Sequence, residues 1–139
     1  MPDISVTVAS VIPSSSAQIA SGTAGATITQ GQALYIDTGD SNKLKLADAD
    51  GTSPANSFAG IALNAASAGQ RVNYCTQDLG GLAIGATLAI GDSVWLSDTP
   101  GGITKTFSEL EAGDKIVHLG VMLTTTTLVL NPTTGGTLA

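Results

Sequence analysis

Two stretches of this sequence, 60 positions apart, share one pattern of glycines, small residues and apolar residues. Residues 25–36 read GATITQGQALYI, and residues 85–96 read GATLAIGDSVWL. The same offset relates GIAL at residues 60–63 to GVML at residues 120–123. A repeat of this kind indicates two equivalent supersecondary units that bury their apolar faces against each other. It is the strongest constraint on what the chain can fold into.

Each half contains short apolar or alternating segments separated by turn residues. Residues 43–46 alternate charged and apolar side chains, which is typical of a half-buried strand. Gly60 and Gly120 fall inside expected central strands, where a glycine marks a bulge or a close backbone approach. Residues 107–112 are the best helical candidate, one turn closed by Gly113. We therefore predict a mostly β fold, a compact β-barrel or β-sandwich-like unit built from two pseudo-repeated halves.

The expected domain boundaries follow from the repeat. Residues 21–131 form one β domain, with halves at about 25–75 and 85–131, because units of about 60 residues are marginal alone. Residues 1–20 form an extended N-terminal arm, and residues 132–139 form a flexible Thr/Gly-rich tail.

In the arm, apolar residues alternate with Ser and Thr, which predicts a strand with one apolar face. Such a strand pairs either with the edge of its own domain or with a neighbouring subunit by strand addition. Its apolar residues are candidates for an interface with a partner: Ile4, Val6, Val8, Val11 and Ile12.

Composition excludes several classes of protein. The 139 residues carry a net charge of −6, and 42% are hydrophobic, so the chain is not a disordered acidic tail. Its five Lys and Arg residues are too few and too scattered for a nucleic-acid-binding patch. No stretch approaches the apolar length of a membrane span, and the first residues do not resemble a signal peptide. We expect a soluble protein with neither a nucleic-acid nor a membrane partner.

The residues that carry catalysis are scarce. His118, the one histidine, lies in an apolar run and is expected to be a core or interface residue rather than a general base. Cys75, the one cysteine, is expected to be a buried inert thiol. We predict no catalytic residue, no cofactor and no metal site. Asp48 and Asp50, together with Asp37 and Asp40 earlier in the chain, keep a calcium site as an alternative to simple turns.

Tyr35 and Trp95 occupy matching positions in the two halves. Paired aromatic residues either anchor the core or form a binding face, and the repeat favours the core, because repeated positions preserve packing first.

The pattern of residues 25–36, followed by GIALNAASAGQRV at residues 60–72, resembles the capsid decoration (cement) proteins of tailed bacteriophages. The resemblance covers roughly residues 20–130. It implies a protein without catalysis that sits as a homotrimer on the outer surface of the virion, made in the host cytoplasm, and bridges major capsid proteins. The apolar residues of the arm are then candidates for the capsid or subunit interface. A tail-fibre or spike module that binds host glycans is the first alternative, and an enzyme using His118 or the aspartates is the second.

Overall fold

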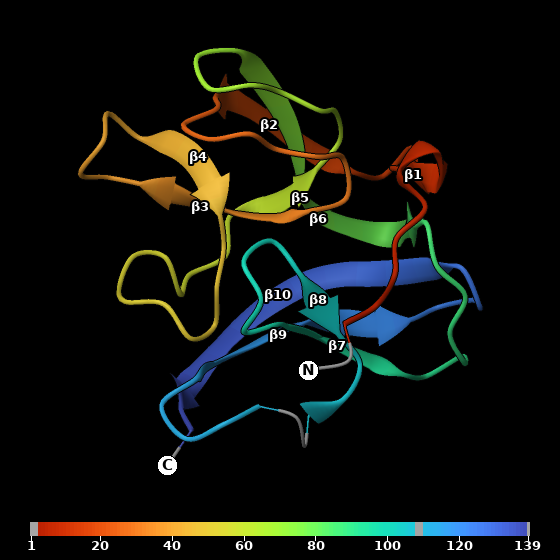
Figure 1. Cartoon of the computed structure of the whole chain (residues 1–139). Helices are drawn as coiled ribbons and strands as arrows, with labels where there is room; N and C mark the ends of the chain where they lie inside the picture. Colours follow the sequence, from red (N-terminus) through yellow and green to blue (C-terminus); the bar gives the residue numbers. More distant parts are fainter. Residues whose placement is uncertain (1–2, 108–109, 139) are drawn as a thin grey trace.

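The computed structural model describes residues 3–107 and 110–138. These residues form ten strands and one short 3₁₀ helix, η1 (Val8–Ser10), in agreement with the predicted mostly β fold (Figure 1). The strands are β1 (Val11–Ile12), β2 (Gln18–Thr23), β3 (Ala33–Asp37), β4 (Lys43–Leu46), β5 (Gly60–Ala62), β6 (Arg71–Ile84), β7 (Ser93–Leu96), β8 (Ile103–Thr104), β9 (Lys115–Met122) and β10 (Thr127–Thr137).

The strands form an antiparallel sheet that curls strongly into a half-barrel. Its order is β4-β3-β5-β6-β10-β9-β7-β8, and β1 and β2 also pair with the long strand β6. A parallel bridge between Ala24 and Leu44 brings the end of β2 back to β4, so the sheet of the first half closes on itself. The first part of the long strand β6 pairs with β2 and β5, and its last part pairs with β1 and β10. Strand β6 therefore joins the two halves.

Two clusters of buried apolar side chains form the core of the described residues. The smaller cluster lies inside the curled first half and consists of Ala24, Ile28, Leu34, Leu44, Ala62, Ala66, Val72 and Tyr74. The larger cluster covers the inner face of β6, β10, β9 and β7, and its largest members are Leu82, Leu96, Leu119, Met122, Leu128 and Leu130. Aliphatic side chains dominate both clusters, as the low aromatic content predicts.

Gly60 and Gly120 are sites of close backbone approach, as the sequence predicts. A Cβ at Gly60 would lie 2.6 Å from the carbonyl oxygen of Cys75. A Cβ at Gly120 would collide with the carbonyl oxygen of Val129, and Gly120 has φ +154°. The pairing of β7 with β9 is irregular next to Gly120, which is the predicted bulge. Side chains larger than hydrogen are excluded at both positions.

Corresponding backbone hydrogen bonds recur at the 60-residue offset of the sequence repeat. The strand order also reads alike outward from the β6–β10 pair, with β5, β3 and β4 on one side and β9, β7 and β8 on the other. Superposition of the two complete halves stays a prediction. The recurring bonds join Gly31 N to Ala62 O and Gly91 N to Met122 O, and Ala62 N to Gln32 O and Met122 N to Asp92 O.

The C-terminal segment differs from the expected flexible tail. Thr133 pairs with His118 and Thr137 with Lys115, so most of the segment continues β10 alongside β9. Thr/Gly-rich composition suggested fraying, but the partner strand supplies the backbone hydrogen bonds. The helical turn predicted at residues 107–112 includes residues 108–109, which lie outside the described residues.

Candidate interaction site

The N-terminal segment, residues 3–14, lies against its own domain and does not project as an extended arm (Figure 1). The amide of Ile4 donates to the carbonyl of Ile103 at 2.9 Å, and the amide of Thr7 donates to that of Gly85 at 2.7 Å. These bonds connect the segment to β8 and to the end of β6. The segment therefore holds two distant parts of the fold together.

The five predicted interface residues have different environments. Ile4 and Val6 are partly buried against the larger core cluster, and Val11 is buried in it. Val8 and Ile12 are 43% and 59% exposed. The strand predicted across residues 4–8 is absent from this described segment, because isolated amides bond to β8 and β6 and no continuous ladder forms. Only Val8 and Ile12 present a large apolar surface to a partner.

Two carboxylates hold the ends of the segment. Asp78, fully buried in β6, accepts hydrogen bonds from the amide of Ser14 at 2.7 Å, from the Ser14 hydroxyl and from the amide of Gly80 at 3.1 Å. Asp3 accepts a hydrogen bond from the hydroxyl of Ser97. The sequence analysis missed Asp78, although a lone carboxylate within a long uncharged stretch was the available signal.

A groove runs beside the segment, between the turn that precedes β3 and the loop that precedes β8. We call it the N-terminal groove; its volume is about 220 Å³. None of its lining residues carries a charge, which suits contact with an apolar or neutral surface. The groove is lined by Ile4, Val6, Val8, Thr29, Gln30, Gly31, Gln32, Gly101, Gly102 and Ile103.

Trp95 lies on the opposite face of β7 from its buried neighbours Val94 and Leu96. Its ring packs against Phe107 and His118, with centroid separations of 4.8 and 4.6 Å. Trp95 and His118 are half-buried, and Phe107 is 40% exposed. The prediction of a core anchor is therefore wrong for Trp95, because strand alternation places it on the outer face. His118 contacts Trp95 at this face with its ring tilted by 59°.

Tyr35 and Cys75 match their predicted places more closely. Tyr35 is half-buried against the larger core cluster. Cys75 is fully buried, and burial raises the pKa of its thiol to about 11, with a smaller contribution from the charge of Asp78. A thiol with this pKa is protonated and unreactive at neutral pH, as the sequence suggested.

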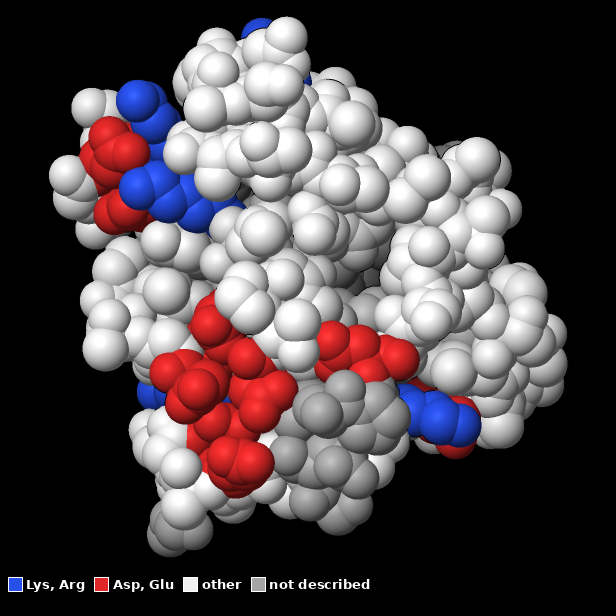
Figure 2. All heavy atoms as spheres, in the orientation of Figure 1, with Lys and Arg blue, Asp and Glu red and all other residues white. Residues whose placement is uncertain are grey.

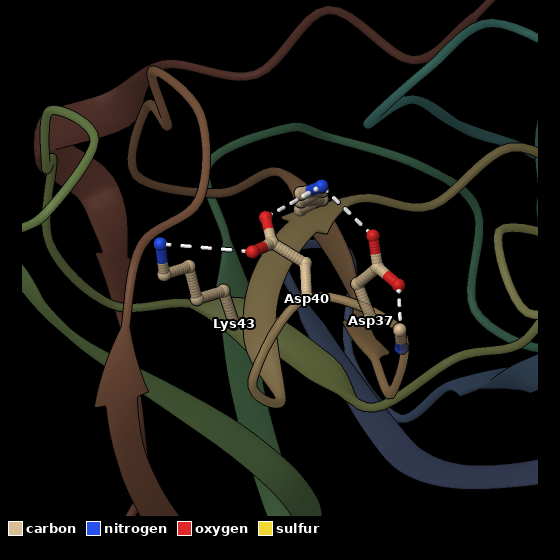
Figure 3. Close-up of polar contacts among 5 residues, drawn as sticks. Asp37, Asp40 and Lys43 are labelled. Atoms are coloured by element: carbon tan, nitrogen blue, oxygen red, sulfur yellow. Dashed lines mark hydrogen bonds and ion pairs between the residues drawn. The ribbon is translucent and has the colours of Figure 1, made fainter.

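The four aspartates that kept a calcium site as an alternative lie in two separate places. Asp37 ends β3, and Asp40 lies in the turn that follows (Figure 3). Lys45 Nζ lies 2.8 Å from Asp37 and 3.0 Å from Asp40. These contacts lower the pKa of both carboxyls. Asp48 caps a turn by accepting the amide of Asp50 at 3.0 Å. In residues 3–107 and 110–138, no group of three His, Cys, Asp or Glu side chains is arranged to hold a metal ion.

Acidic side chains gather on one face of the molecule (Figure 2). Desolvation raises the pKa of Asp48 and of Asp98, and neighbouring carboxylates add to both shifts. The carboxylates that interact electrostatically with Asp48 or Asp98 are Asp3, Asp50, Glu111 and Asp114, of which Asp114 is buried. Each is contributed by a loop or an element end, so the negative charge is concentrated away from the strand faces.

Comparisons with known proteins supply no relative. A scan against protein-family models, a search of curated proteins and a search of solved structures each found no match. The part of the chain that the structure describes contains no helix with the length and apolar content of a membrane span.

Proposed function

We propose that this protein is a bacteriophage capsid decoration (cement) protein. It binds the outer surface of the head as a trimer and stabilises the shell by noncovalent bridging of major capsid proteins. The observation that carries the proposal is the uncharged N-terminal groove with the exposed Val8 at its side. The resemblance of the sequence pattern to decoration proteins supplies the identity of the partner.

The stabilising action follows from a rigid contact surface. The groove is lined by residues 29–32 of the first half and residues 101–103 of the second, so a partner bound there contacts both halves of the fold. A trimer that bridges several capsid subunits gains avidity, because every contact after the first is intramolecular. Each bridging interface would bury roughly 1,200–2,000 Å² in total, the usual size of a specific contact.

The test is binding of the purified protein to undecorated heads, measured by sedimentation of heads with bound protein. Val8→Asp places a charge at the groove and is expected to reduce occupancy at least tenfold. Ile90→Asp is the matched control, since Ile90 is 70% exposed and lies outside the N-terminal segment. Failure of the wild-type protein to bind heads, or equal occupancy by both variants, would contradict the proposal.

Deletion of residues 1–12 is a poor test of this site. The deletion would remove Val11 from the core and the contacts of Ile4 and Val6 with it. Truncation is therefore expected to destabilise the domain as well as to remove the candidate contact. A point substitution at Val8 leaves those buried contacts intact.

A second candidate function rests on the aromatic cluster. Trp95, Phe107 and His118 form a half-exposed platform of the kind on which sugar rings stack. A recognition module for host glycans would bind a glycan array through this platform and would localise to the tail. Loss of array binding in Trp95→Ala, with head binding absent in the wild type, would favour this alternative.

A further inference from the structure

The part of the sheet formed by β1, β6, β10, β9 and β7 is apolar on the face that points away from the larger core cluster, where an antiparallel sheet usually carries polar residues. The register of β1, β6, β10, β9 and β7 sets its side chains in rows. We call this set the outer face; it comprises Ile12, Gly81, Ala83, Ser93, Trp95, His118, Val121, Leu123, Thr127 and Val129. The opposite face of these strands is the inner wall of the larger core cluster.

The rows follow directly from strand pairing. Ile12 pairs with Ala83, Ala83 pairs with Thr127, and the carbonyl of Thr127 accepts the amide of Leu123 at 2.9 Å. A second row runs from Val129 through Val121 to Ser93. Directly paired residues share a face, so both rows point the same way.

Large apolar side chains on this face remain uncovered. Ile12, Leu123 and Val121 are 59%, 49% and 40% exposed. Small residues separate them: a Cβ at Gly81 would lie 3.4 Å from Leu123 and 3.1 Å from Thr127. The face thus offers both projecting side chains and shallow positions beside them. Contiguous apolar patches of this kind on a folded chain mark interaction surfaces.

Charge decides which partner fits. The chain carries a net charge of −6 with His118 neutral, yet none of the outer-face residues is charged. Two copies that met through the acidic face would place like charges together, and that repulsion is costly. A strongly charged partner would bury its own charges here without counter-ions. A second copy of the chain meets neither obstacle, because the same neutral apolar patch lies on both sides.

We infer that the outer face is the surface through which copies of this chain associate. This deepens the proposed function, because it names a surface that would join copies of the chain in an oligomer, and it rests on that proposal only for its biological purpose. The N-terminal groove shares no residue with the outer face. One surface can therefore join copies while the other meets the shell.

The experiment is the mass of the purified full-length protein by light scattering, at several concentrations. The wild type is expected to exceed 13.8 kDa and to reach a whole multiple of that mass. Val121→Asp with Leu123→Asp is expected to weaken self-association at least a hundredfold. Ile19→Asp is the matched control, since Ile19 is 54% exposed on β2 and lies off the outer face. It is expected to associate like the wild type.

A milder pair, Val121→Thr with Leu123→Thr, keeps strand propensity and guards against misfolding of the charged variant. It is expected to weaken association at least tenfold while the circular dichroism spectrum stays unchanged. A monomeric wild type, or association unaffected in this pair, would overturn the inference. Head binding is measured separately: a monomer that decorates heads overturns the outer-face inference alone, whereas an oligomer that never binds heads supports it and overturns the proposed function.

Discussion

Asp78 is the buried anchor of the N-terminal segment, and its replacement tests how that segment is held. Its carboxylate is fully buried and accepts three hydrogen bonds, two from Ser14 and one from the amide of Gly80. Gly80 also leaves room for the approach, because a Cβ there would lie 2.5 Å from the Ser14 hydroxyl oxygen. Asp78→Ala removes all three acceptor contacts at once.

The expected cost follows from these contacts. A hydrogen bond to a charged group contributes about 1.5–3 kcal/mol, and a buried donor left unpaired adds a desolvation penalty. Ser14 is half-buried and Gly80 is exposed, so water can reach some of the freed donors. We therefore expect Asp78→Ala to lower the free energy of unfolding by about 2–4 kcal/mol, a large share of a typical domain's stability. The Tm is expected to fall by on the order of 10 °C.

Urea unfolding followed by circular dichroism measures the free energy, and hydrogen exchange at the amides of Ile4 and Thr7 reports release of the segment. Ser14→Ala is the control: it keeps the amide contact with Asp78 but removes the hydroxyl, which donates to Asp78 and accepts the exposed amide of Ser16 at 3.1 Å, and it is expected to cost about 1 kcal/mol. The double variant should fall short of the sum of the two single costs, because both changes remove the same contact. A loss below about 0.5 kcal/mol for Asp78→Ala would refute the anchoring role.

Three further substitutions and treatments test other parts of the structure. Gly120→Ala is expected to prevent folding or to cost more than about 4 kcal/mol, measured by urea titration, because its Cβ would collide with a backbone carbonyl. The pKa values of Asp37 and Asp40 lie below 3.8 through their contacts with Lys45, so the associated stability is present above about pH 4 and is lost as pH falls through the lowered values. Lys45→Met should therefore lose less stability than the wild type in urea titrations carried from about pH 4 to about pH 2. Cys75 is expected to resist iodoacetamide at about pH 8 until urea unfolds the chain, and rapid labelling of the native protein, read by mass spectrometry, would contradict its burial.

Glycine positions were the most informative part of the sequence for the fold. Gly60 and Gly120 were expected to mark a bulge or a close approach, and both lie against a neighbouring backbone. A glycine inside an apolar strand can be recognised from the sequence alone. It indicates a position where any larger side chain would collide with a neighbouring backbone. The buried Cys75 was predictable from residue type, because free cysteine is among the most often buried residues, although its burial directly after Tyr74 breaks the alternation of β6.

Trp95 and the N-terminal segment show where sequence reasoning fails. Trp95 was assigned to the core together with Tyr35 because a repeat preserves packing first. Strand alternation sets Trp95 opposite Val94 and Leu96, and pairing with β9 decides that the face with Trp95 and His118 is the outer one. The apolar residues of the N-terminal segment were read as one strand, whereas the structure divides them between core and solvent. In both cases the decisive information is which distant strand lies alongside, and a local pattern does not contain it.

The sequence by itself determined the mostly β character of this protein, the positions of its tight turns and the close backbone approaches at glycine, because each depends on the conformational preferences of neighbouring residues. The tertiary structure alone decided which faces of β7, β9 and β10 are buried. It also decided that Asp78 accepts hydrogen bonds from Ser14 and that Val121 and Leu123 are exposed to solvent. These outcomes depend on pairings between residues far apart in the chain, and a shift of one position in register would exchange the buried and exposed faces.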